Sequence, residues 1–500
     1  MFNFTKHGWI NLYTLFSEQS FNLLNMYGRS GLIIQSGIAT EKSSMDFYQY
    51  LNKNSSIVSL FDFENKLGLF PSVHKMMKFC LLTLSRQRNI KLTNYAFFLH
   101  KVDELREPDR IFNLDFNDIN MLNPNTKTCM IFRSKYDAEL VKHIYRNSVV
   151  LVNETEHSNN PWKVDVSQMF NISDVSKNLI SVLDYEENGY ILKKMSNLLL
   201  DKSVYVPFYE SKYIFNFDHR FSSFENTNEY KVKNGQATLL SDEDKNNPDK
   251  LVIPRYWISG EKVEKYYKKR SIRNNWILAF RMISSPTNER TLISTIISSC
   301  GLSNSLNLIY GITSYKILLL LGNLNAISLD YVVRQRVGGM NVNVWNAKQF
   351  PVFPPDSYTE EDIAFIKPRV LELVYTAYNL KPFAEDMGYS GEPYKWDENR
   401  RANLKAELDA YHAILYGLNR KQLRYILDPV DLTSRELENI LDDWEEVENP
   451  LIESEYKKRC EQSTFPGETF RVLKDKENRK FGEYRTRRLV LEKSEEMSGE

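Results

Sequence analysis

Two short segments carry the residue types of half a metal-dependent nuclease site, a glutamate followed two residues later by a lysine. They are Glu64-Asn65-Lys66 and Glu210-Ser211-Lys212. Such a site also needs an upstream acid that shares the metal, and Asp201 is the only nearby candidate, for the second segment. Three-residue matches arise often by chance, so nuclease chemistry with Glu210 and Lys212 is kept only as a minor alternative.

Other motifs that would define an enzyme class are missing from the sequence. It contains no GxxxxGK or GxGxxG loop, so neither nucleotide hydrolysis nor Rossmann-type dinucleotide binding has support. HExxH, paired CxxC and GxSxG are also missing, and the seven histidines are not at metal-ligand spacing. We therefore expect no metal site.

The cysteines and the hydropathy of the chain predict a cytoplasmic protein. Cys80, Cys129, Cys300 and Cys460 lie far apart, as expected for reduced, structural cysteines rather than a disulfide framework. The first 16 residues lack the pattern of a signal peptide. The most apolar stretch, 317–321, is far shorter than the ~20 residues of a membrane helix.

The net charge of zero hides a strong asymmetry along the chain. Residues 251–350 contain 13 Lys and Arg against 4 Asp and Glu, a net charge of +9, whereas residues 351–500 contain 23 against 32, a net charge of −9. A basic block between neutral and acidic parts is typical of a nucleic-acid-binding face, although a merely solvated surface has the same composition.

Aromatic residues are interleaved with the positive charges of this block. Lysine contacts phosphates as a point charge, while arginine can read guanine through two hydrogen bonds. A solvated helix face is the lesser alternative for residues 265–270. Asp330, four residues before Arg334, permits an ion pair on a helix surface instead. The candidate DNA contacts are Arg255, Lys265, Lys268, Lys269, Arg270, Arg273, Arg281, Arg334, Arg336 and Lys348.

The N-terminal part alternates between helical and extended patterns. Apolar residues recur at helical spacing over 9–24, and strand-like runs follow at 32–34 (interpreted as buried), 57–63 and 78–84. This alternation favours an α/β layer. An open sheet of three strands leaves an edge unpaired, so this part looks cut at its N-terminus or completed by another chain.

The remaining chain divides by composition. Residues 105–204 are mixed and polar, and residues 205–356 are rich in aromatic and β-branched residues, with a helical stretch over 314–335. Pro351, Pro354 and Pro355 mark the predicted boundary between this part and a helical region. Helices are then predicted from Glu360 through Tyr378 and from Asp397 to Leu415.

A series of short segments in a fixed order resembles the adenine-N6 DNA methyltransferases of restriction–modification systems (type IIG-like), from just after their catalytic loop onward. The resemblance covers nearly the whole chain, and it becomes specific because many weak matches occur in order. The segments begin with residues 11–18, 28–33, 36–40, 60–65, 69–74 and 78–84. They continue with residues 123–126, 132–134, 137–140, 209–212, 217–220, 288–291, 337–339, 396–398, 425–429 and 482–486.

The resemblance implies a sheet of seven strands, the last one antiparallel, of which this chain carries the final third. It also implies S-adenosyl-L-methionine as cofactor, yet two parts are missing: the glycine-rich loop that holds the cofactor and the Asn/Asp-Pro-Pro-aromatic loop that holds the adenine amine. Residues 353–356 and 160–162 do not fit the second loop. We therefore expect that this chain alone neither binds the cofactor nor methylates DNA. The N-terminal half or subunit that would complement it is either a separate polypeptide or has been lost from the gene.

One element of the active site is retained by resemblance. In the family, an aromatic residue in the loop between the last two strands stacks on the flipped adenine, and Phe70, before Pro71, is in the matching place. The alternative is a core residue at the mouth of a hairpin.

Together these features predict an α/β remnant of a methyltransferase sheet (1–104), a connector (105–204), a mixed α+β target-recognition domain (205–356) and a helical region (357–500). The expected partner is double-stranded DNA, and no membrane is expected. The favoured function is sequence recognition within an adenine methyltransferase. A stand-alone DNA-binding specificity subunit is the alternative from another class.

Overall fold

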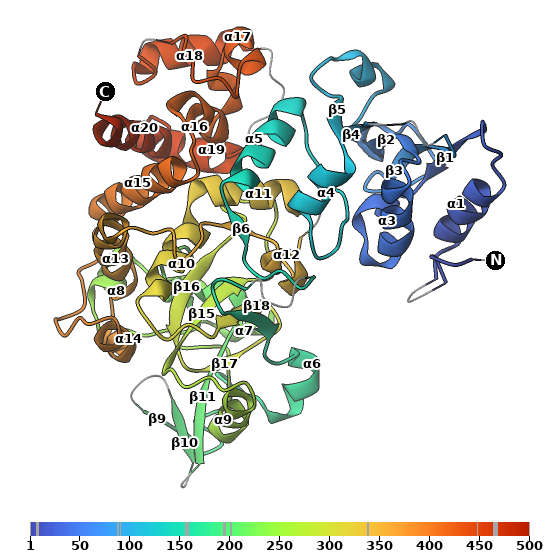
Figure 1. Cartoon of the computed structure of the whole chain (residues 1–500). Helices are drawn as coiled ribbons and strands as arrows, with labels where there is room; N and C mark the ends of the chain where they lie inside the picture. The colour runs from blue at the N-terminus through green and yellow to red at the C-terminus, as the bar shows by residue number, and fades with distance from the viewer. Residues whose placement is uncertain are drawn as a thin grey trace. The chain divides into compact units, whose positions relative to one another are not determined.

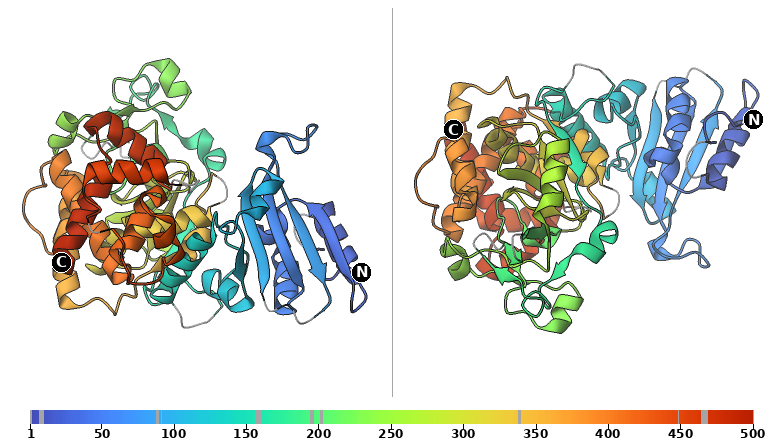
Figure 2. Two further views of the ribbon diagram at one scale, coloured as in Figure 1. Left: turned by 90° about the horizontal axis from the view of Figure 1, so that it is seen from above. Right: turned by 90° about the horizontal axis from the view of Figure 1, so that it is seen from below.

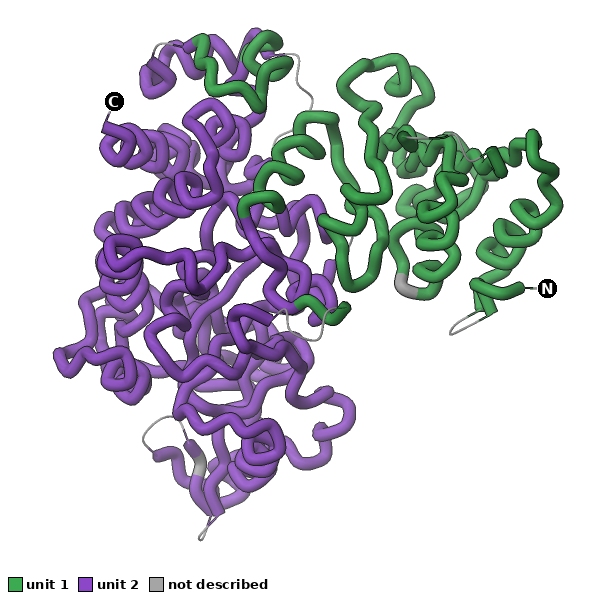
Figure 3. The backbone as a smooth tube through the Cα atoms, in the orientation of Figure 1, with its two compact units in different colours: residues 1–147, 153–158, 433–446 green, residues 148–152, 159–432, 447–500 purple. Residues whose placement is uncertain are grey.

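The computed structural model describes residues 2–6, 10–87, 90, 92–155, 160–193, 197–200, 203–337, 340–447, 449–463 and 469–499. The chain forms two compact units (Figure 3), each built from segments that are distant in sequence. Unit 1 consists of Met1–Asn147, Asn153–Ser158 and Thr433–Glu446, and unit 2 consists of Ser148–Val152, Asn159–Leu432 and Val447–Glu500.

Unit 1 is built around a five-stranded sheet in the order β1-β3-β2-β4-β5 (Figures 1 and 2). Strand β3 is antiparallel to β1 and β2, and β2 is parallel to β4. The strands are β1 (Arg29–Ile34), β2 (Ile57–Glu64), β3 (Lys78–Ser85), β4 (Thr93–Leu99) and β5 (Phe112–Leu114).

The three predicted strands are confirmed, but two expectations about this sheet are wrong. The 32–34 run is not buried, because β1 is an edge strand whose Ile33 is 61% exposed. The sheet also extends past residue 104, since β5 pairs with β4 and brings the following helices into the unit. The helices are α1 (Leu12–Asn22), α2 (Gly37–Thr40), α3 (Met45–Lys53), α4 (Phe116–Leu122), α5 (Lys135–Arg146) and α17 (Ser434–Glu438).

Unit 2 contains two larger sheets and two small strand pairs. In the first sheet β8, β14, β11, β10 and β9 follow one another, with β17 also paired to β11, and in the second the order is β16-β15-β18-β7. The predicted connector therefore has no independent fold, because β7 and β8 are strands of these sheets. The strands of both sheets are β7 (Asp165–Gln168), β8 (Ile180–Ser181), β9 (Ile191–Leu192), β10 (Leu198–Leu200), β11 (Ser203–Tyr209), β14 (Tyr256–Ser259), β15 (Trp276–Arg281), β16 (Ser294–Ser298), β17 (Gly301–Leu302) and β18 (Leu306–Tyr310).

The helical stretch predicted over 314–335 is two helices, α10 (Lys316–Asn325) and α11 (Ile327–Arg336), at an angle of 62°. The backbone of Ala326 is extended (φ −63°, ψ 140°), and the freed amide of Ile327 donates to the Asp409 carboxylate at 2.7 Å. Among the described residues no single helix is long and apolar enough to cross a membrane, and only this bent pair passes such a test jointly.

The proline cluster does not separate two domains. One hydrophobic core joins strand residues such as Trp276 and Leu278 to helical residues up to Leu408. Pro351 and Val352 form β19 (Pro351–Val352), which pairs with β6 (Val149–Val150) inside the same unit. The boundary at 356 is therefore wrong, because the helices after it cover the same core.

The two helices predicted after the proline cluster are confirmed by their caps. Helix α13 (Glu360–Val374) begins with a capping box of Thr359 and Asp362, and α15 (Glu398–Leu415) begins at Asp397, whose carboxylate accepts from the amide of Arg400 at 2.6 Å. The other helices of unit 2 are α6 (Ile172–Val175), α7 (Glu229–Lys233), α8 (Asp242–Asn246), α9 (Gly260–Lys269), α12 (Val344–Lys348), α14 (Lys381–Asp386), α16 (Arg420–Leu427), α18 (Glu453–Gln462), α19 (Arg471–Phe481) and α20 (Arg485–Ser498). A further strand pair joins β12 (Ser222–Ser223) to β13 (Thr238–Leu239).

The C-terminal helices are held together by one buried carboxylate. Asp431 is fully buried and pairs with Arg424 of α16 at 3.0 Å, Arg459 of α18 at 2.8 Å and Arg487 of α20 at 2.7 Å. Burial alone would raise the pKa of Asp431, but the three guanidinium groups outweigh it and hold the pKa at about 2.

All four cysteines are free, as predicted, and Cys80, Cys129 and Cys300 are buried. Burial raises the pKa of each of these three thiols well above the usual range, so they remain protonated at neutral pH. They serve as small apolar core residues.

Candidate nucleic-acid interface

Helix α9 carries four exposed lysines of unit 2. It buries Val263 and Tyr267, and the Tyr267 hydroxyl donates to the carbonyl of Cys300 at 2.8 Å, which fixes the inward face of the helix. The outward face carries exposed lysines at helical spacing. We call Lys262, Lys265, Lys268 and Lys269 the α9 lysine face.

Most of this face is available for contacts outside the chain. Lys265 and Lys269 are exposed and one helical turn apart, and Arg273 is exposed just after the helix. Lys268 pairs with Glu264 at 2.9 Å, but both side chains are more than half exposed, so the pair is weak. Lys262, which the sequence analysis did not single out, donates to Asn178 at 2.5 Å.

Three candidate arginines are engaged inside unit 2. Arg255 donates to the carbonyl of Lys233 at 2.7 Å, and Arg270 donates to the Tyr310 hydroxyl at 2.8 Å. Arg281 donates twice to the carbonyl of Ile214, and burial lowers its pKa to about 10. These side chains support the architecture around α9 and β15.

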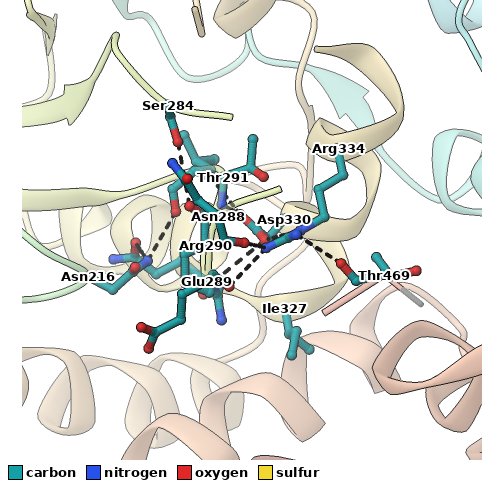
Figure 4. Close-up of polar contacts among 12 residues, drawn as sticks. Asn216, Ser284, Asn288, Glu289, Arg290, Thr291, Ile327, Asp330, Arg334 and Thr469 are labelled. Carbon is teal, nitrogen blue, oxygen red and sulfur yellow. Dashed lines mark hydrogen bonds and ion pairs between the residues drawn. The ribbon is translucent and has the colours of Figure 1, made fainter. Parts of the chain in front are cut away.

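Arg334 is a structural residue of α11, which is buried on all sides (Figure 4). Its guanidinium has five N–H donors, and all five are used. Nε donates to Asp330 at 2.9 Å. The two terminal nitrogens donate to four carbonyls at 2.7–3.0 Å, those of Pro286, Asn288, Glu289 and Thr469. A base edge would find no donor left, so the expectation that Arg334 reads DNA does not fit this structure.

Asp330 completes the arrangement from the opposite side. Its second oxygen accepts from the amides of Thr291 and Leu292 at 2.8 and 2.6 Å. The alternative interpretation of Asp330 and Arg334 as an ion pair is thus confirmed, but the pair is buried rather than on a helix surface. Together the two side chains fix the segment between β15 and β16 (Figure 4).

Of two further candidates, Arg336 is buried and Lys348 is partly buried. Arg336 is 7% exposed, and the Lys348 ammonium lies 3.9 Å from Asp165. Gly338 and Gly339, which follow Arg334 and Arg336 in the sequence, lie outside the described residues. Of the ten candidate residues, the exposed ones are Lys265, Lys268 and Lys269 on the α9 lysine face, and Arg273.

In unit 1, Phe70 lies in the β2–β3 loop and is 38% exposed. Its ring makes an edge-to-face contact with Phe79 of β3 at 4.9 Å between centroids. Phe70 thus has features of a core residue, because it packs on the partly buried Phe79, and of a base-stacking residue, because its ring remains accessible to solvent.

Asn65 holds this loop in place, a role that the sequence analysis did not predict. Its buried amide donates to the carbonyls of Phe70 and Val73 at 3.0 and 2.8 Å, and it accepts from the amide of Phe70 at 2.9 Å. An Asn that opens a loop between strands, five residues before an aromatic, is the only signal that the sequence offered.

Removing this amide should free the loop. For Asn65→Ala we expect the Phe70 amide proton to exchange with solvent at least about tenfold faster, because three hydrogen bonds worth ~1 kcal/mol each are lost. Hydrogen exchange with residue resolution measures this, with Asn113→Ala, an exposed Asn of β5, as the control. Unchanged protection of Phe70 would show that the loop is held by its apolar contacts instead.

Polar side chains gather at the carboxyl ends of the parallel strands β1, β2 and β4, the edge where ligands bind in open α/β sheets. Ser36 follows β1 and donates to Asp62 of β2, while His100 follows β4 and lies 3.0 Å from Glu64. Burial raises the pKa of Asp62 to about 6, although the Ser36 hydrogen bond opposes this.

The pKa of Glu64 is shifted in the opposite direction from that of Asp62. Burial disfavours its charge, but hydrogen bonds from Lys66 and His100 and the charge of Lys78 dominate and hold its pKa at about 2. With three partners already in place, Glu64 is part of a charge network at the sheet edge rather than an open metal ligand.

In the second glutamate–lysine segment the glutamate likewise already has partners within the segment. Glu210 pairs with Lys212 at 3.0 Å and accepts from the Tyr213 hydroxyl at 3.2 Å. Asp201 lies outside the described residues. Across the described part of the chain no three His, Cys, Asp or Glu side chains are grouped as metal ligands. The geometry gives the nuclease alternative no further support.

No family model and no curated protein matches the chain. Among solved structures it is similar to the type IIG restriction endonuclease BpuSI, with a TM-score of 0.28 and 11% identity over 82% of this chain and 50% of that one. It is also similar to the type IIL restriction-modification enzyme MmeI in complex with DNA, with a TM-score of 0.39 and 10% identity over 90% of this chain and 51% of that one. The chain spans about half the length of both.

Proposed function

We propose that this chain recognises double-stranded DNA within an adenine-N6 DNA methyltransferase of the restriction–modification kind. The α9 lysine face carries the DNA-binding part of the proposal. It concentrates cations on an exposed helix whose inward face is fixed, and it lies in the block with a net charge of +9. Neutralised phosphates release counterions, which provides affinity without regard to sequence.

The methyltransferase part of the proposal is supported by unit 1. The ordered segments of the resemblance, the antiparallel β3 and the accessible Phe70 fit the final third of a methyltransferase sheet. S-adenosyl-L-methionine would supply the methyl group of the complete enzyme. The residues present include neither of the two loops that would hold cofactor and adenine, so a complementing N-terminal half must provide both.

Within that assembly the role of Phe70 is to stack on the target base. A base rotated out of the duplex loses its neighbours, and an aromatic face replaces that contact. Asn65 keeps the backbone of Phe70 in position before the base arrives.

The salt dependence of DNA binding tests the proposal. Replacing Lys265, Lys268 and Lys269 with Ala should weaken binding to all duplexes alike. It should also reduce the slope of log K against log salt by up to ~3, about 0.9 for each lost phosphate contact. Fluorescence anisotropy with random-sequence duplexes between low and moderate salt gives both quantities.

The matched control replaces three other exposed lysines of unit 2, Lys381, Lys457 and Lys458. It removes the same charge and should leave most of the slope intact. An equal loss of slope in both triple variants would mean that α9 acts only through net charge. A chain without DNA affinity at low salt, even beside its complementing half, would contradict the proposed function.

A further inference from the structure

Helix α1 buries mostly polar residues and exposes large apolar ones. Thr14, Ser17 and Glu18 are buried together with Phe21. Leu12 and Phe16 are 70% and 67% exposed. Leu23, directly after the helix, is 76% exposed and falls on the same stripe, since residues 4 and 11 positions apart share a helix face. A helix on the surface of a globular protein has the opposite arrangement.

The orientation of α1 is fixed from its inward side. The Glu18 carboxylate accepts from the amides of Asn3, Phe4 and Thr5 at 2.6–3.3 Å and from the Thr5 hydroxyl at 2.7 Å. If α1 were rotated so that the apolar stripe faced inward, Glu18 would lose these hydrogen bonds. The hydrogen bonds of Glu18 therefore keep the apolar stripe on the outside of unit 1.

The apolar surface continues onto the neighbouring edge strand. Met26 and Tyr27, in the turn before β1, are 74% and 81% exposed, and Ile33 on β1 is 61% exposed. In the described sheet β1 has β3 on one side and no strand on the other. Unpaired backbone groups beside exposed apolar side chains form a template for strand addition.

We infer that this surface, the α1 stripe with the free edge of β1, is where a second polypeptide docks by adding a β-strand to β1 and covering α1 with apolar side chains. The free edge argues for a polypeptide strand, because only a strand supplies regularly spaced amide donors and carbonyl acceptors. A lipid surface would satisfy the stripe but not the edge.

The position of the edge indicates which polypeptide this is. A strand added beside β1 has one of its ends next to Ser36, and thus extends the sheet edge where Asp62 and the Phe70 loop lie. That this partner carries the cofactor-binding loops rests on the proposed function. The partner expected here is an α/β domain with an unpaired edge strand for β1 and apolar side chains that cover α1.

Co-production of the chain with the polypeptide encoded directly upstream of it tests the inference. The two should purify as a 1:1 complex, with the amides of residues 29–34 more protected from hydrogen exchange than in the chain alone. Phe16→Glu and Leu23→Glu should each weaken the complex at least about tenfold, as for central apolar contacts of an interface. Leu239→Glu, at an equally exposed leucine of unit 2, should leave it unchanged.

Several results would overturn the inference: no complex with the wild-type chain, a complex insensitive to both substitutions, or a homodimer that the same substitutions dissociate. Binding to anionic phospholipid vesicles that both substitutions abolish would also overturn it, in favour of a lipid surface. DNA binding separates the two proposals. If the complex forms through α1 but neither it nor the chain binds DNA, the docking surface stands and the proposed function fails.

Discussion

Replacing Arg334 with alanine should lower the free energy of unfolding of unit 2 by about 3–5 kcal/mol, the usual cost of breaking a buried ion pair. The substitution leaves Asp330 without its closest cation, and it leaves four inward-facing carbonyls without a donor. Urea unfolding followed by circular dichroism gives the change.

Arg273→Ala is the matched control, because that side chain is exposed, and it should change stability by less than about 0.5 kcal/mol. DNA binding by the Arg334 variant, measured where it is still folded, should retain the salt slope of the wild type. A stable Arg334 variant that loses discrimination between DNA sequences would contradict the structural role and restore a role in base reading.

Replacing Asp431 with alanine should be at least as damaging, about 3–5 kcal/mol, because three buried or nearly buried arginines would face each other without an anion. The effect should fall on the C-terminal helices, which the carboxylate connects. Thermal unfolding and hydrogen exchange of α16 and α20 measure it. Asp442→Ala, an exposed acid, is the control.

The same carboxylate predicts a pH dependence. The folded pKa of Asp431 is about 2, below the ordinary value of 3.8, so the group stabilises the fold at any pH above about 4. This contribution, roughly 2 kcal/mol, should disappear as the pH falls from about 4 to about 2. In the Asp431→Ala variant that part of the acid sensitivity should be missing. An unchanged acid profile would show that other carboxylates dominate.

Local signals in the sequence predicted the elements well. Short apolar runs predicted β1, β2 and β3, the acidic residues from Glu360 predicted the start of α13, and Asp397 as a cap predicted the start of α15. Such signals are reliable because the interactions behind them are between residues close together in the sequence. The 314–335 stretch shows their limit, since the break at Ala326 depends on Asp409, a residue far along the chain.

The candidate site was predicted only where exposure follows from local pattern. The lysines of α9 alternate with Val263 and Tyr267, so the sequence itself shows which face is outward. The sequence of α11 contains no such signal: Arg334 belongs to a helix buried on every side, and its acceptors come from a loop and from Thr469. Asn65 was missed for a related reason, because its partners lie in a loop of irregular backbone.

The discontinuous make-up of unit 1 has a consequence for biosynthesis. Residues 433–446, which include α17, belong to the unit that residues 1–147 begin, and Glu438 lies near enough to Tyr136 to act on its pKa, after burial and Asp109. Domains fold in the order in which they leave the ribosome. Unit 1 therefore stays incomplete while the segment 159–432 is translated, and its last piece arrives only when most of unit 2 has already been made. A nascent chain stalled before residue 433 lacks α17, so it leaves exposed the part of unit 1 that α17 contacts in the finished protein.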